Sequence, residues 1–273
     1  MERLEAALAK AREQRAARMQ SGEFSRSGAS PVAVPARADW AGLPTLTIPA
    51  DRAQRYRISA LVAGKDAAPY DMLRSRTIRS MKDKNWTRLA VTSPDASCGK
   101  TTVSLNLALS LARQKDLRVM LFDLDLRRPG LNKLLGQSTK HSFWEVLERK
   151  VPFEEVARSV GGNLIVAANS AVARNPSELL QSSMTSEVLG EIEANWRPDI
   201  IIFDMSPMLA SDDNVGFLGN VDCALLIAAA ESTKLSNIDI CEKELGQLTN
   251  VLGVVLNKCR YDDESVAYAY GSY

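Results

Sequence analysis

VTSPDASCGKTT, residues 91–102, carries the strongest sign of how this chain folds. It overlaps a short apolar run, residues 88–94, and leads into residues 101–114, which are apolar on nearly all sides. We therefore expect a strand, a loop that ends in Gly-Lys-Thr-Thr, and a helix. Such a loop binds phosphate, because its backbone N–H groups and the helix dipole converge on the anion. Pro94 replaces the usual first glycine, but it lies outside the part of the loop that would wrap the phosphate.

The side chains of this loop suit a nucleotide and its magnesium ion. Lys100 would reach the outer phosphates, and the Thr101 hydroxyl would bind Mg²⁺. Gly99 lets the backbone pass close to a phosphate. The alternative is an ordinary helix N-terminus, which the strand before it and the helix after it disfavour. The predicted nucleotide contacts from this loop are Ser97, Cys98, Gly99, Lys100, Thr101 and Thr102.

Two further strand ends carry acidic side chains. VMLFDLDLRRP, residues 119–129, places Asp123 and Asp125 at the end of an apolar strand, on one face because side chains alternate. One of them could instead cap the following helix. DIIIFDMSP, residues 199–207, ends another strand with Asp204, the expected ligand of magnesium-bound water beside a phosphate loop. The three strand ends together predict one magnesium-nucleotide site.

Apolar runs alternate with helix-patterned segments along the rest of the chain. The runs lie at residues 118–125, 163–168, 199–205, 223–229 and 251–258. This alternation indicates an α/β fold with a mostly parallel central sheet covered by helices on both faces. Pro69 is expected to open a helix over residues 69–81. Asn257 ends the last run, where its amide could read a nucleotide base or cap the strand exit.

Composition divides the chain into four parts. Residues 1–20 are rich in helix formers and predict a helix, either solvated or docked on a partner. Residues 21–50 contain Ser, Gly, Ala and Pro and predict a flexible linker. Residues 51–260 form the predicted globular domain. Residues 261–273 form a tail with four of the six tyrosines, either a phosphoacceptor segment or a weakly packed end without a role.

The totals exclude several classes of function. With 34 basic and 33 acidic residues, charge gives no reason to expect nucleic acid as a partner. One histidine, His141, removes most histidine-based metal and triad chemistry. The four cysteines show no C-x-x-C spacing, which favours a reduced, cytoplasmic chain. We expect no signal peptide or membrane span, so any membrane role would come through a partner.

These motifs together resemble the bacterial tyrosine kinases of exopolysaccharide and capsule synthesis, within the P-loop NTPases that include MinD and ParA. The resemblance covers roughly residues 57–273. TSPDASCGKTT corresponds to the first Walker motif, LFDLDLRRP to the second acidic motif of these kinases, and IIIFDMSP to the Walker B strand, and the terminal tyrosines also match. MinD and ParA have an extra lysine early in the loop, where this chain has Asp95, which argues against that branch.

The resemblance implies an ATP-dependent protein-tyrosine autokinase that uses Mg²⁺. Asp123 would accept the proton of the incoming tyrosine, Asp125 and Asp204 would orient metal-bound water, and Arg127 would support the acidic pair. The implied catalytic residues are Lys100, Asp123, Asp125, Arg127 and Asp204, and the implied metal ligands are Thr101, Asp125 and Asp204.

The implied phosphoacceptors are Tyr268, Tyr270 and Tyr273, modified by neighbouring subunits. Two alternatives stay open: a MinD- or ParA-like ATPase switch that phosphorylates no protein, and a nucleotide-binding regulator without turnover.

The resemblance also implies partners. A separate transmembrane chain-length regulator of polysaccharide export would activate the kinase and recruit it to the inner face of the cell membrane. A homo-oligomer is expected, but the family's ring-forming helix carries Glu, Arg and Arg where this chain has Ala68, Asp71 and Arg74. Either the pairing has changed at Asp71, or the ring is altered or absent.

Overall fold

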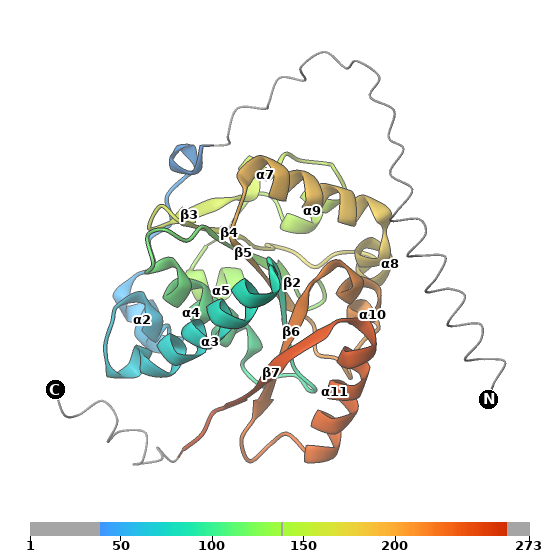
Figure 1. Cartoon of the computed structure of the whole chain (residues 1–273). Helices are drawn as coiled ribbons and strands as arrows, with labels where there is room; N and C mark the ends of the chain where they lie inside the picture. The colour runs from blue at the N-terminus through green and yellow to red at the C-terminus, as the bar shows by residue number, and fades with distance from the viewer. Residues whose placement is uncertain (1–38, 138, 261–273) are drawn as a thin grey trace, which may run out of the picture. The chain divides into compact units, whose positions relative to one another are not determined.

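The structure, a computed structural model, describes residues 39–137 and 139–260. Its centre is a sheet of seven strands in the order β3-β4-β2-β5-β1-β6-β7 (Figure 1). All neighbouring strands run parallel except β3 and β4, which are antiparallel. The strands are β1 (Arg88–Thr92), β2 (Val119–Leu124), β3 (Arg158–Val160), β4 (Leu164–Ala167), β5 (Ile200–Met205), β6 (Cys223–Ala229) and β7 (Asn250–Asn257).

Helices cover both faces of this sheet. One face packs against α2 (Ala50–Arg55), α3 (Ala68–Lys84), α4 (Lys100–Ala112) and α5 (Leu131–Leu135). The other face packs against α6 (Phe143–Leu147), α7 (Phe153–Val156), α8 (Pro176–Gln181), α9 (Ser183–Trp196), α10 (Asp213–Phe217) and α11 (Leu235–Leu248). Short 3-10 turns lie at Trp40–Gly42, Ser59–Leu61, Lys65–Ala67 and Leu218–Asn220. The expected α/β fold with a mostly parallel, doubly covered sheet is confirmed.

Alternation of side chains along the central strands places Asp123 and Asp204 on the face of the sheet that α4 covers. In β2, Leu121 lies in the core beneath α4, whereas Phe122 packs on the opposite face, with its ring centroid 4.6 Å from that of Phe143. Asp123 therefore continues the α4 face. In β5, Asp204 lies two residues after Ile202, which is in the core on the α4 face, so Asp204 also lies on that face. Asp123 and Asp204 are register partners in adjacent strands.

The predicted strands and the predicted helix agree with the observed elements to within a few residues. The helix expected from Pro69 begins one residue earlier and ends before Asn85, which adopts the left-handed conformation at φ 55°. The strand β3 was missed because only Ser159 of its three residues is buried, so it contains no apolar run.

The predicted linker, residues 21–50, is wrong for its described part. Trp40, Leu43, Leu46 and Ile48 are buried, and Trp40 Nε1 donates a hydrogen bond of 2.9 Å to a backbone carbonyl of α9. These apolar side chains recur every two or three residues, and that spacing anchors a segment that composition alone marks as a linker. The predicted helix over residues 1–20, the linker up to residue 38 and the tail lie outside the described residues.

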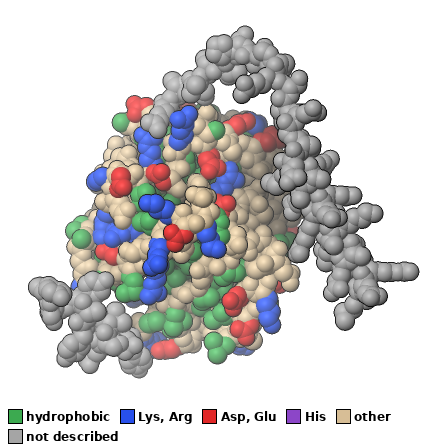
Figure 2. Space-filling view, in the orientation of Figure 1, with side chains coloured by type: hydrophobic (Ala, Val, Ile, Leu, Met, Phe, Trp, Pro, Cys, Tyr) green, Lys and Arg blue, Asp and Glu red, His purple; other side chains and the backbone are tan. Residues whose placement is uncertain are grey.

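β7 forms one edge of the sheet and pairs with β6 only. Its side chains Val254 and Leu256 are 45% and 59% exposed. Figure 2 shows apolar side chains gathered over the region where Figure 1 places β7, while basic and acidic side chains intermingle above it.

Among the helices of the described residues, none combines the length and apolar character needed to cross a bilayer.

Two of the three positions that correspond to the family's ring-forming helix make contacts within this chain. Asp71 accepts hydrogen bonds from Ser110 Oγ, at 2.7 Å, and from Arg113, both on or next to α4. Arg74 donates to the Ser110 carbonyl at 3.1 Å and pairs with Asp71 at 3.3 Å. These contacts hold α3 against α4.

Replacing Asp71 with Asn should destabilise the fold. Burial raises the pKa of Asp71, but hydrogen bonds from Arg113 and Ser110 outweigh it, so the pKa lies below its ordinary value. We expect Asp71→Asn to lower the free energy of unfolding by about 1–3 kcal/mol at pH 7, as for hydrogen bonds to charged groups. The difference should shrink as pH falls below about 4, because the wild-type carboxylate then protonates on unfolding.

Denaturant unfolding at pH 7, 4 and 3 measures this difference. Asp83→Asn, at an exposed position of the same helix, is the matched control and should have little effect. Equal stabilities of the Asp71 variant and the wild type at pH 7 would show that the contacts of Asp71 with Arg113 and Ser110 do not stabilise the fold.

Candidate nucleotide-binding site

The loop between β1 and α4 is shaped by left-handed backbone conformations. Ser97 has φ 64° and Gly99 has φ 90°. A side chain at position 99 would collide with the amide of Asn257, so this position requires glycine. Gly99 then opens α4, whose first residue is Lys100. The loop therefore has the strand-loop-helix geometry that was expected of a phosphate site.

The carboxyl end of β7 holds this loop from outside. Asn257 Nδ2 donates to the Cys98 carbonyl at 2.8 Å, and Lys258 Nζ donates to the Ser97 carbonyl at 2.7 Å. The Cys98 side chain is buried, with its sulfur 3.5 Å from the Thr233 hydroxyl, so this residue can offer a ligand its backbone only. The Asn257 amide thus binds the phosphate loop, a contact that neither predicted role described, and reading a base stays a prediction.

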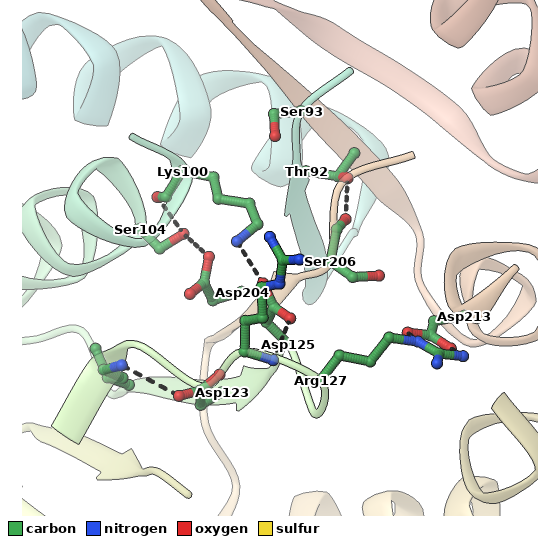
Figure 3. Close-up of polar contacts among 12 residues, drawn as sticks. Thr92, Ser93, Lys100, Ser104, Asp123, Asp125, Arg127, Asp204, Ser206 and Asp213 are labelled. Atoms are coloured by element: carbon green, nitrogen blue, oxygen red, sulfur yellow. Dashed lines mark hydrogen bonds and ion pairs between the residues drawn. The ribbon is translucent and has the colours of Figure 1, made fainter. Parts of the chain in front are cut away.

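Lys100 forms an ion pair with Asp125, one of the three predicted acidic residues. Its Nζ lies 2.7 Å from Asp125 Oδ2, and both side chains are largely buried (Figure 3). Burial lowers the pKa of Lys100, but the nearby Asp204 and Asp125 carboxylates outweigh this effect and raise it. Asp125 Oδ1 also accepts the backbone N–H of Arg128 at 3.0 Å. Lys100 is therefore charged and already stands at the site.

Asp123 and Asp204 lie side by side with no exposed surface. Asp123 Oδ2 accepts the backbone N–H of Leu131 at 3.2 Å, and Asp204 Oδ1 accepts the Ser104 hydroxyl at 3.2 Å. Asp123 Oδ1 has no hydrogen-bond partner among the described residues, although it is buried. A buried carboxylate oxygen without a partner is costly, which indicates that a ligand or a proton completes the site.

Burial shifts the pKa of both carboxyls upward. Burial raises the pKa of Asp123 well above its ordinary value, and the neighbouring Asp204 raises it further. Burial also raises the pKa of Asp204, although Lys100 and hydrogen bonds from Thr101 and Ser104 oppose the rise. A carboxyl group whose pKa is raised in this way keeps its proton to a higher pH than an exposed aspartate does.

The predicted ligands Thr101, Asp125 and Asp204 offer a set of oxygen atoms that suits Mg²⁺. The described residues contain no group of three or more His, Cys, Asp or Glu arranged to hold a metal by themselves. Mg²⁺ does not need one, because it is usually held by one or two carboxylates together with waters and substrate phosphates. The residues present therefore fit a magnesium ion that arrives with a nucleotide.

Arg127 makes no direct contact with the acidic pair that it was expected to support. Its guanidinium turns away from Asp123 and Asp125, as Figure 3 shows. Nε and Nη2 donate to the Asp213 carboxylate at 2.9 and 3.0 Å, and Nη2 also donates to Ser177 Oγ at 2.8 Å. The acidic pair thus receives no direct contact from Arg127.

Two residues of the site were not predicted. Ser104 lies one helical turn after Lys100, so the 3.6-residue period could have placed it beside the acidic strand ends. Asp213 lies 86 residues from its partner Arg127, and no local pattern connects the two.

The other loop residue singled out earlier, Asp95, accepts hydrogen bonds from Asn237 Nδ2 at 3.2 and 3.3 Å. The predicted acceptors Tyr268, Tyr270 and Tyr273 lie outside the described residues.

Comparison with known proteins agrees with this geometry. Residues 89–269, more than half of the chain, match the family described as the CobQ/CobB/MinD/ParA nucleotide binding domain. The chain is 33% identical over 184 residues to the tyrosine-protein kinase Etk of Escherichia coli K12, which covers 67% of this chain and 25% of Etk. It is 29% identical over 206 residues to the tyrosine-protein kinase YwqD of Bacillus subtilis, which covers 74% of this chain and 85% of YwqD.

The solved kinase domain of Escherichia coli Etk has the same fold. It superposes with a TM-score of 0.67 at 29% identity, over 73% of this chain and 78% of that domain. The chain thus spans about a quarter of full-length Etk but most of YwqD. The chain therefore belongs to the CobQ/CobB/MinD/ParA nucleotide-binding domain family, and it is similar in sequence and structure to bacterial tyrosine-protein kinases.

Proposed function

We propose that this chain is an ATP- and Mg²⁺-dependent protein-tyrosine kinase that phosphorylates its own C-terminal tyrosines, Tyr268, Tyr270 and Tyr273. The observation that carries the proposal is Asp123, a buried carboxyl with a raised pKa and one unpartnered oxygen, beside Lys100 and Asp204. An ATPase needs a phosphate loop and an acidic strand end. A second buried acid beside them suits the additional task of taking a proton from a hydroxyl group.

Each residue has a task in phosphoryl transfer. Lys100 would leave Asp125 and bind the outer phosphates of ATP, and Thr101, Asp125 and Asp204 would hold Mg²⁺, which neutralises charge on the transferred group. The tyrosine oxygen forms a bond to the γ-phosphorus, the bond from that phosphorus to the ADP oxygen breaks, and the phenolic proton passes to Asp123. A proton acceptor is needed because free tyrosine has a pKa near 10.

The rival function is an ATPase switch that phosphorylates no protein. In the MinD and ParA branch, a lysine early in the loop reaches the nucleotide of a neighbouring subunit. Here the corresponding residue is Asp95, whose carboxylate is occupied by Asn237 within the same chain. This contact favours the kinase over the switch.

The setting of this activity is also a proposal. Relatives such as Etk and YwqD are named tyrosine-protein kinases, and the resemblance to kinases of capsule and exopolysaccharide synthesis suggests control of polymerisation and export. A transmembrane chain-length regulator would activate the chain and recruit it from the cytoplasm to the membrane. Phosphates on the tail add about −1.5 to −2 charge each, which would loosen a homo-oligomer by repulsion.

The first test separates the kinase from its rivals. The 273-residue chain and its activator are incubated with Mg²⁺ and ATP labelled at the γ-phosphate, and both protein-bound and free phosphate are measured. We expect label on the tail, a loss of label when Tyr268, Tyr270 and Tyr273 are all changed to Phe, and no label in Lys100→Met. Tyr56→Phe, outside the tail, should keep the wild-type labelling. Free phosphate without labelled protein would favour the switch, and neither product would favour a regulator without turnover.

The second test concerns Asp123 as the proton acceptor. Asp123→Asn should lower kcat by about 10²- to 10⁴-fold, the usual contribution of a general base. The wild-type kcat/KM should rise with pH through the raised pKa of Asp123, because only the ionised carboxylate accepts a proton, and Asp123→Asn should lose this acidic limb. Fluorescent-nucleotide binding is the control, and the affinity should change little. An unchanged pH profile in the variant would assign proton transfer to another group.

A further inference from the structure

Arg127 and Asp213 form an ion pair that the proposed chemistry does not use. Asp213 is completely buried at the start of α10 and accepts four hydrogen bonds. They come from Nε and Nη2 of Arg127 at 2.9 and 3.0 Å, from Ser177 Oγ at 2.7 Å and from Ser211 Oγ at 3.0 Å. Burial raises the pKa of Asp213, but the hydrogen bonds from Arg127, Ser177 and Ser211 outweigh it and lower the pKa. A charged carboxylate is thus held in place by three segments.

Arg127 connects this anchor to the loop that follows β2. The loop, residues 125–131, makes two backbone contacts with the acidic residues of the site. The N–H of Arg128 donates to Asp125 Oδ1 at 3.0 Å, and the N–H of Leu131 donates to Asp123 Oδ2 at 3.2 Å. Any shift of this loop would therefore change the orientation of both carboxylates.

In the proposed function, Lys100 moves from Asp125 to the outer phosphates of the nucleotide. In this structure its Nζ lies 2.7 Å from Asp125 Oδ2 and helps to fix the loop. When Lys100 turns to a phosphate, Asp125 loses this charged partner. The bidentate pair of Arg127 and Asp213 is unaffected, because Asp213 belongs to α10 and not to the phosphate loop.

We propose that Arg127 is a positioning residue: its pair with Asp213 fixes the loop 125–131, so that Asp123 and Asp125 keep their orientation after Lys100 has moved to the nucleotide. This inference rests on the proposed function for its effect on turnover. Its structural part, a loop that stays ordered in the nucleotide-bound state, does not depend on which reaction follows. Arg127 touches none of the reacting groups, and it acts through the backbone of its own loop.

The chain contains a matched control for this pair. Arg149 makes bidentate contacts with Glu191 at 3.0 and 2.8 Å, and its side chain is 42% exposed, close to the 45% of Arg127. Glu191, however, is 56% exposed, whereas Asp213 is fully buried. Exposed pairs contribute little, since water competes with them. Arg149→Gln therefore removes an arginine of equal exposure that holds no part of the site.

The experiment compares Arg127→Gln with Arg149→Gln in the full chain. For Arg127→Gln we expect kcat for phosphoryl transfer to fall about 10- to 100-fold, because small misplacements of reacting groups are costly. Nucleotide affinity should change less than about threefold, which follows from Lys100 and the phosphate loop being intact. Arg127→Lys should recover part of kcat, since it keeps the charge but not the bidentate geometry of the guanidinium. Arg149→Gln should match the wild type.

Hydrogen exchange supplies a readout that does not depend on turnover. With Mg²⁺ and the non-hydrolysable ATP analogue AMP-PNP bound, amides of residues 125–131 should exchange faster in Arg127→Gln than in the wild type, whereas without nucleotide the two should agree. Equal exchange in the bound state, or an unchanged kcat in an active protein, overturns the proposal. A wild type that labels no protein would instead contradict the proposed function, and the exchange comparison would still decide this one.

Discussion

The site depends on an imbalance of buried charge at the carboxyl ends of β1, β2 and β5. One lysine faces three aspartates, and two of these, Asp123 and Asp204, have no exposed surface. Charges that are removed from water must be paired or neutralised by a proton or a metal. Without a nucleotide, Lys100 pairs with Asp125, and the raised pKa of Asp123 favours a proton on the remaining pair. A divalent cation would replace that proton, which explains why such a site suits a nucleotide that carries Mg²⁺ better than a free anion.

Local sequence patterns explain how much of the site could be predicted from the sequence. Strand periodicity placed Asp123, Asp125 and Asp204, since alternation fixes the face and the parallel sheet fixes the edge. The Gly-Lys-Thr-Thr loop placed Lys100. These are local patterns, and the structure brings the four residues together as expected. The ion-pair partner of Arg127 could not be predicted, because Asp213 lies 86 residues away on a helix whose packing no local pattern reveals.

The fold could be predicted to a similar extent, and its prediction failed where a segment leaves no clear local pattern. Long apolar runs gave the central strands, whereas β3 has too few buried residues to leave a pattern. The segment from Trp40 to Ile48 resembles a linker in composition, yet its spaced apolar side chains pack on the domain. At α3, substitution pattern alone could not distinguish a changed pairing from a lost ring. The structure shows that Asp71 and Arg74 bind α4, so both side chains have partners before any second copy approaches.

The contact between the end of β7 and the phosphate loop has a physical consequence for the proposed function. β7 ends with Asn257, this residue and Lys258 hold the phosphate loop, and the described chain ends at residue 260. Thirteen further residues, 261–273, could extend by roughly 45 Å, at about 3.3–3.6 Å per residue, which is enough to reach this site or that of a neighbour. The length of the tail therefore does not decide whether it reaches the site of its own chain or that of a neighbour. Charge acts later: an unmodified tyrosine is neutral, whereas phosphotyrosine is strongly negative and would be repelled by the net negative charge that remains on three aspartates and one lysine after the magnesium nucleotide has left. An acidic site thus favours release of its own product.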